Sequence, residues 1–129
     1  KSAMAMHAIA AANLILIPSK ANEADAKGAK RTFSHVQSVA ETMERDIPAL
    51  VVMMDVDTHT NITQAITDAF DVQSVPRLDA MCAHRTGFKE MTSTGKAPQG
   101  SARMSAKSVL ADLQGRGLVN FYRSGSWPK

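Results

Sequence analysis

The chain has 129 residues, of which 44% are hydrophobic and 21% charged, which is enough for one globular domain and too little for two. Its apolar runs, such as residues 14–17, fall far short of the ~20 residues that cross a bilayer. Its single cysteine, Cys82, excludes an internal disulfide and fits a cytoplasmic location. Membrane-spanning, disulfide-framework and collagen-like classes are therefore excluded.

Charge divides the chain into two unlike parts. Residues 1–71 carry 6 Lys and Arg against 9 Asp and Glu, whereas residues 72–129 carry 9 against 3. A basic half of this kind attracts polyanions, such as nucleic acid or anionic lipid. Chance asymmetry of a solvated surface is the alternative interpretation.

The first half of the chain alternates helical and buried-strand patterns. The first dozen residues are rich in Ala and Met and are typical of a helix, which Asn13 ends. Residues 14–17 form an unalternating apolar run, which favours a strand buried on both faces. Asn22, with an acid three positions later, resembles a helix start, and apolar residues at helical spacing continue this helix to about Arg45. Residues 49–54 predict a second buried strand.

The second half continues this alternation. Residues 62–70 have the spacing of a short amphipathic helix, and residues 72–78 predict a brief third strand interrupted by Pro76. Residues 86–94 favour a helix that stops at a glycine. Residues 101–113 predict a last helix, which two glycines end.

Helices that alternate with buried strands predict an α/β fold with three layers around a parallel sheet. Residues 1–129 are expected to form one domain, with a flexible tail over residues 116–129. Because two or three strands make a thin sheet, the pattern indicates part of a larger one.

A cluster of polar residues, Asp55-Val56-Asp57-Thr58-His59, follows the second strand. Ligands gather at the carboxyl ends of strands in parallel sheets, and alternate residues of an extended segment share one side. Asp55, Asp57 and His59 are therefore candidates to converge on a metal ion. The aspartates also resemble the DxDx[TV] signature of haloacid-dehalogenase-like phosphatases, except that His59 replaces its Thr or Val. A solvated loop that caps the next helix is the alternative.

Other catalytic templates find no support. No HExxH pair and no GxSxG elbow occurs, so each histidine is expected to be structural. The segment Thr94-Gly95-Lys96-Ala97 lacks both the upstream glycine and the Ser or Thr of a P-loop. Cys82 is expected to be buried or idle, and the eight methionines are most simply core residues.

The last predicted helix carries two basic residues away from its apolar stripe. Arg103 and Lys107 lie four positions apart, and Arg116 follows the helix. Charges on one helix face neutralise phosphates without reading bases, which gives salt-sensitive, nonspecific DNA binding. An exposed, solvated helix face is the alternative.

Two stretches resemble one known family. Residues 8–19, AIAAANLILIPS, are similar to a helix–strand segment that reads "aadlvliP" in many partition ATPases of the ParA/MinD family, and Asp25 matches an acid that is common at the start of the next helix. Residues 84–91, with Gly95 after them, are similar to the family's "R…F.EA…G" segment. The order and spacing fit from about Met6 to Leu113. The chain thus resembles the C-terminal half of that family, nearest to the VirC-type proteins of T-DNA transfer and their plasmid ParA relatives.

The resemblance implies a P-loop NTPase-like fold of which this chain is a part, because the family's Walker A loop is not among its residues. It implies ATP and Mg²⁺ as cofactors, with Asp55, Asp57, Arg77 and Leu78 beside the nucleotide base. With the phosphate-binding parts missing, this chain alone is expected to bind ATP weakly and not to hydrolyse it.

The resemblance also implies a role in plasmid or chromosome partition, or in DNA transfer. The family's members form homodimers that bind DNA, here through Arg103, Lys107 and Arg116. A ParB-like or relaxosome protein is the implied further partner. No membrane partner is expected, because the glycines after the last helix end it early.

Two functions of other classes stay open. One is a noncatalytic α/β interaction module that oligomerises through an exposed sheet edge. The other is a metal-dependent or phosphatase-like enzyme built on Asp55 and Asp57.

Overall fold

The structure, a computed structural model, describes residues 3–84 and 86–120. Within these residues the elements follow in the order α1 (Ala3–Ala11), β1 (Ile15–Ser19), α2 (Glu23–Met43), β2 (Ala49–Val56), α3 (Asn61–Val72), β3 (Arg77–Ala83), α4 (Thr86–Thr94) and α5 (Gly100–Gly115). Among them, no helix is both long enough and apolar enough to span a bilayer.

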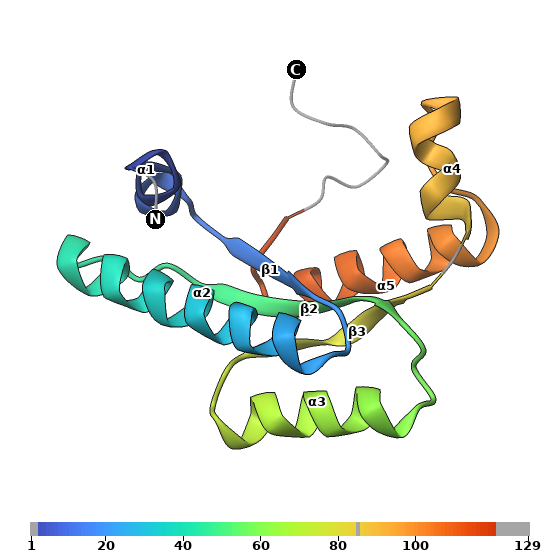
Figure 1. Ribbon diagram of the computed structural model, residues 1–129. Helices are drawn as coiled ribbons and strands as arrows, with labels where there is room; N and C mark the ends of the chain where they lie inside the picture. Colours follow the sequence, from blue (N-terminus) through green and yellow to red (C-terminus); the bar gives the residue numbers. More distant parts are fainter. Residues whose placement is uncertain (1–2, 85, 121–129) are drawn as a thin grey trace.

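The strands form one parallel sheet in the order β1-β2-β3. The two predicted apolar runs are its first two strands, and Ile17 lies beside Val51 in the register. All three strands run in the same direction, so their carboxyl ends share one edge of the sheet, at the right of Figure 1. This is the edge at which ligands gather in folds of this class.

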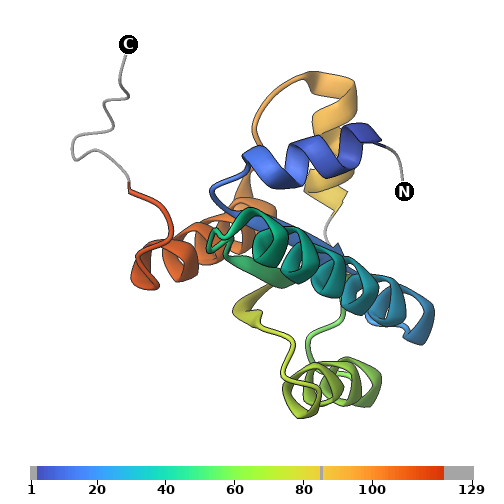
Figure 2. The same cartoon turned by 90° about the vertical axis from the view of Figure 1, so that its left-hand side faces the viewer.

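Helices cover both faces of the sheet, which confirms the predicted three-layer α/β fold. Helices α2 and α3 lie on one face and α5 on the other (Figures 1 and 2). Successive residues of β2 point to opposite faces. The core under α2 and α3 is built around Val36, Val51, Met53 and Phe70. The core under α5 is built around Leu50, Val52, Leu78 and Leu113.

Helix α2 begins where the sequence predicted. The side chain of Asn22 accepts a hydrogen bond from the backbone N–H of Asp25 at 2.8 Å, which satisfies one of the free donors of the first turn. The helix ends at Met43, and Glu44 follows in the left-handed region with φ 52°. The predicted end near Arg45 is thus confirmed to within two residues.

The third strand differs from its prediction. Residues 72–75 do not form a strand, because α3 runs to Val72 and its last turn closes on itself. The backbone N–H of Val75 donates to Phe70 O at 2.9 Å, and Ser74 has φ 56°. Strand β3 begins only after Pro76, whose carbonyl accepts from Val51 N–H. Proline has no N–H to donate, so the sheet pairs through its oxygen.

Helix α5 begins one residue before the predicted Ser101, and it packs against β3. Helix α4 stands away from the sheet and packs on α5 (Figures 1 and 2). Of the predicted tail, residues 116–120 are described and close the α5 side of the core through Leu118 and Val119. Residues 121–129 lie outside the described part of the chain.

The expectation that methionines fill the core is wrong for most of those described. Met53 is fully buried, whereas Met4 and Met104 are 81% and 71% exposed and Met6, Met43 and Met91 are also exposed. Cys82 is buried as expected, and burial raises the pKa of its thiol, so it is a poor nucleophile.

Candidate functional site

Three charged or titratable side chains meet at the carboxyl edge of the sheet. Lys20 directly follows β1, Asp55 lies near the end of β2 and His84 directly follows β3. His84 Nδ1 is hydrogen-bonded to Asp55 Oδ1, and Lys20 Nζ lies 3.8 Å from Asp55 Oδ2. The hydrogen bond with His84 is the main cause that lowers the pKa of Asp55, and the charges of His84, Lys20 and Lys89 lower it further. We call Lys20, Asp55 and His84 the edge cluster.

Asp55 has an unusual backbone. Its φ of 54° lies in the left-handed region, which a residue other than glycine seldom adopts inside a strand. Asp and Asn are the side-chain-bearing residues that tolerate this region best. Because strained backbone is retained most often where a side chain must be aimed, this conformation marks the edge cluster as a candidate site.

Asp57 and His59 build the loop that starts α3. Asp57 Oδ1 accepts from the backbone N–H of His59 at 3.1 Å, and the carbonyl of Asp57 accepts from Thr63 Oγ1 at 2.7 Å. Thr60 caps the helix through the N–H of Thr63. Among the described residues, no group of three or more His, Cys, Asp and Glu side chains is placed to hold a metal ion. The predicted convergence of Asp55, Asp57 and His59 on a metal is therefore absent.

Arg77 and Leu78 lie at the amino end of β3, whereas Asp55 and Asp57 lie at the carboxyl end of β2. Arg77 begins β3, and its guanidinium donates to both carboxylate oxygens of Asp71 at 3.0 Å. Leu78 is fully buried under α5. The structure thus does not bring the four residues expected at a nucleotide base into one site.

The outward face of α5 is basic. Arg103 and Lys107 are exposed, whereas Ala102 and Leu113 on the other side of the helix are buried. In the part of the chain that the structure describes, neither Arg103 nor Lys107 forms an ion pair. The helix contains one acidic residue, Asp112, and it faces inward.

Arg116 differs from the other two basic residues. Its Nε donates to Asp112 Oδ1 at 2.7 Å and its Nη2 to Asp79 Oδ2 at 3.2 Å. Asp112 also accepts from the backbone N–H of Ala80 at 2.9 Å. Arg116 therefore ties the end of α5 to β3, and two carboxylates offset its charge.

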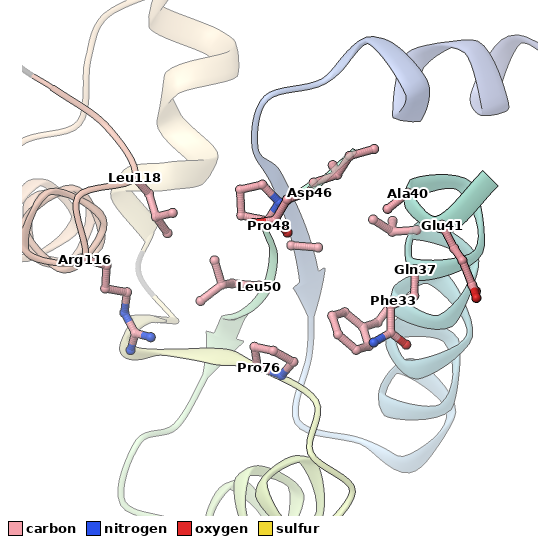
Figure 3. A pocket seen from close by; sticks show the side chains of 13 residues that line it. Phe33, Gln37, Ala40, Glu41, Asp46, Pro48, Leu50, Pro76, Arg116 and Leu118 are labelled. Atoms are coloured by element: carbon pink, nitrogen blue, oxygen red, sulfur yellow. The ribbon is translucent and has the colours of Figure 1, made fainter. Parts of the chain in front are cut away.

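A groove lies at the amino ends of the strands, away from the edge cluster. Its volume is about 640 Å³ and it runs between the side of α2 and the end of α5. Figure 3 shows Pro48 and Leu50 between Phe33 on one side and Arg116 and Leu118 on the other. Apart from Arg116, the groove gathers none of the predicted site residues.

Comparison with known families decides what this arrangement belongs to. A family model described as VirC1 protein matches residues 1–114. The chain belongs to the VirC1 family. VirC1 proteins are ParA/MinD-like, so the predicted VirC-type resemblance is confirmed. Among curated proteins, none matches this chain.

ParA-like membership implies the use of ATP and Mg²⁺ in general. The described glycines with positive φ, which suit a phosphate cradle, are Gly95, Gly100 and Gly117, and they lie around α4 and α5 rather than at the carboxyl ends of β1–β3. At those ends, the Lys20 ammonium already faces Asp55. The described residues of this VirC1-family chain therefore do not fit a triphosphate with its magnesium.

Proposed function

We propose that this VirC1-family chain serves DNA partition or transfer by binding duplex DNA nonspecifically through the outward face of α5. The carrying observation is a carboxylate-free surface on which Arg103 and Lys107 are exposed and unpaired among the described residues. Two cations one helical turn apart neutralise neighbouring phosphates without reading bases. Family membership supports the role, because ParA-like proteins act in partition and transfer.

Arg116 contributes less to this proposal than its charge suggests. Its ion pairs with Asp112 and Asp79 must weaken before it can neutralise a phosphate. Arg103 and Lys107 are free of that cost. We therefore assign them the larger share of the affinity, in a homodimer or in a complex with a partner protein of the transfer machinery.

The test is the salt dependence of duplex DNA binding, measured by fluorescence anisotropy. Each lost phosphate contact flattens the plot of log K against log salt by about 0.9, so Arg103→Ala with Lys107→Ala is expected to flatten it by about 2. The matched control is Lys30→Ala with Arg31→Ala, one exposed lysine and one exposed arginine on α2 that form no ion pair among the described residues, which removes the same charge. If both double variants lost the same affinity and the same salt dependence, overall charge alone would account for DNA binding, and the proposal would be contradicted.

The edge cluster carries no part of this proposal. We propose that these 129 residues alone do not hydrolyse ATP, because their sequence contains no phosphate-binding glycine loop.

A second candidate function is a noncatalytic interaction module. Strand β1 is an edge strand, and Leu16 is 39% exposed although its neighbour in the register, Leu50, is 6% exposed. The core under α5 contains residues of β2 and β3 and, among the described residues, none of β1. An open edge strand with an apolar side chain favours pairing with a strand of another chain.

A further inference from the structure

His35 on α2 has an unsatisfied imidazole nitrogen. Its Nε2 is buried and has no hydrogen-bond partner among residues 3–84 and 86–120. Three residues further along α2, the hydroxyl of Ser38 donates to Ser34 O at 3.2 Å. Buried polar atoms are nearly always paired, so an orphan nitrogen calls for a ligand that the protein alone does not supply.

The nitrogen belongs to a residue that lines a cavity between α1 and α2. The cavity has a volume of about 250 Å³, which is enough for an ion with its ligating atoms. Helix α1 crosses over the end of α2 that precedes β2 (Figure 1). The residues that line the cavity are Met6, His7 and Ala10 from α1 and His35, Ser38, Val39, Thr42 and Met43 from α2.

The side chains around this cavity offer imidazole, thioether and hydroxyl groups and no carboxylate. Two imidazoles, from His7 and His35, are accompanied by two thioethers, from Met6 and Met43, and no carboxylate lines the space. Thioethers select soft monovalent metals such as Cu(I), and imidazole suits copper equally well, whereas Mg²⁺ and Ca²⁺ require oxygen ligands. The two methionines are 42% and 48% exposed, so core packing does not account for their positions.

We propose that the cavity between α1 and α2 is a binding site for a soft monovalent metal ion, Cu(I), held by the imidazoles of His7 and His35 with thioether support from Met6 and Met43. In this proposal the imidazole of His35, whose Nε2 has no partner among the described residues, is the ligand from α2. This site is independent of the DNA-binding face on α5.

The site also gives α1 a second attachment. Helix α1 has no buried residue, and the Arg45 guanidinium holds its end by donating to Ala10 O and, at 2.9 Å, to Ala12 O. An ion shared by His7 and His35 joins the two helices directly. Metal binding is therefore expected to slow hydrogen exchange of the α1 amides.

The experiment is a competitive titration of the 129-residue chain with Cu(I) under anaerobic conditions, with a chromophoric chelator as competitor. One ion is expected per chain, and His7→Ala or His35→Ala is expected to weaken binding at least about tenfold. Met43→Leu, which keeps the volume and removes the thioether, is expected to weaken it less. The matched controls are His59→Ala in the loop before α3 and Met104→Leu on α5, neither of which lines the cavity.

A measurement on the unaltered chain keeps the proposal testable if a variant does not fold. One equivalent of Ag(I), a redox-inert substitute for Cu(I), is expected to shift the imidazole ¹⁵N signals of His7 and His35 together. Shifts confined to His59 or His84, no shift, or Cu(I) affinity unchanged in both histidine variants would overturn the proposal.

Discussion

The carboxylate of Asp112 links α5 to β3. It accepts hydrogen bonds from Ala80 N–H and Arg116, and its side chain is 15% exposed. Burial by itself raises the pKa of Asp112, but the hydrogen bond from Ala80 and the contacts with Arg116 outweigh it and hold the pKa below its ordinary value. The charged form is therefore the one that stabilises the fold.

Removing this carboxylate is expected to destabilise the protein. Asp112→Ala leaves the Ala80 N–H and the Arg116 guanidinium without their partner, which costs about 1–3 kcal/mol in the free energy of unfolding. Urea denaturation measures this loss. The control, Glu90→Ala on the exposed surface of α4, is expected to change stability by about 0.5 kcal/mol or less. Equal effects would show that Asp112 is not a structural link.

The loss depends on pH in a defined direction. The pKa of Asp112 is lower in the folded state than the ordinary ~3.9 of an unfolded chain. Its contribution is thus complete above that value and disappears as the pH falls through the folded pKa. The stability difference between the unaltered protein and Asp112→Ala is expected to shrink below about pH 4. A difference that grows in acid would contradict this account.

The edge cluster shows what residue patterns could and could not predict. Asp55 was predicted at a ligand-binding edge because it follows an apolar run, and it lies there. Lys20 and His84 were not predicted as its partners, because 35 and 29 positions separate them from Asp55 and only the register of three strands brings them together. Their positions directly after β1 and β3 were the available signal.

At the scale of elements, α5 packs against the sheet through apolar side chains near its end. Leu113 is 3% exposed and packs with Leu50 and Leu78, whereas Leu110 is 45% exposed on the same helix. Leu113→Ala is expected to cost about 2–5 kcal/mol, because it leaves a cavity against the sheet. Leu110→Ala is expected to cost about 1 kcal/mol or less. Thermal and urea unfolding measure the stability of both variants. Equal losses would mean that Leu113 is not the residue through which α5 packs on the sheet.

The elements that sequence could predict are those with unambiguous local patterns. The strands at residues 14–17 and 49–54 are apolar without alternation, and Asn22 has the side chain that a helix start requires. The strand predicted at residues 72–78 was misplaced by about five residues. Val72 and Val75 favour a strand locally, but the turn that closes α3 on Phe70 determines their backbone instead.

At the scale of the whole molecule, α5 packs on β2 and β3, whereas Leu16 on β1 is exposed. The open face and edge at β1 predict self-association, which analytical ultracentrifugation measures. Leu16→Lys places a charge on this edge and is expected to shift the chain towards monomer. Ile62→Lys, on the exposed surface of α3, is the control and is expected to leave the state unchanged. A monomer at all concentrations would exclude the interaction-module alternative.

Charge is also unevenly placed over the molecule. The basic half of the sequence includes α5, whose outward face carries Arg103 and Lys107 without a carboxylate, while Arg116 is held in ion pairs. A surface of this kind attracts a polyanion over the range of the Debye length, about 8 Å at physiological salt. The central claim is that duplex DNA binds to this face.

The measurement that tests this claim most directly is the mapping of backbone amide shifts in ¹⁵N-labelled protein when a short duplex is added. The account predicts shifts concentrated at residues 100–111, similar for unrelated DNA sequences and reversed by added salt. Shifts concentrated at the edge cluster or on α2, or none at all at low salt, would contradict it.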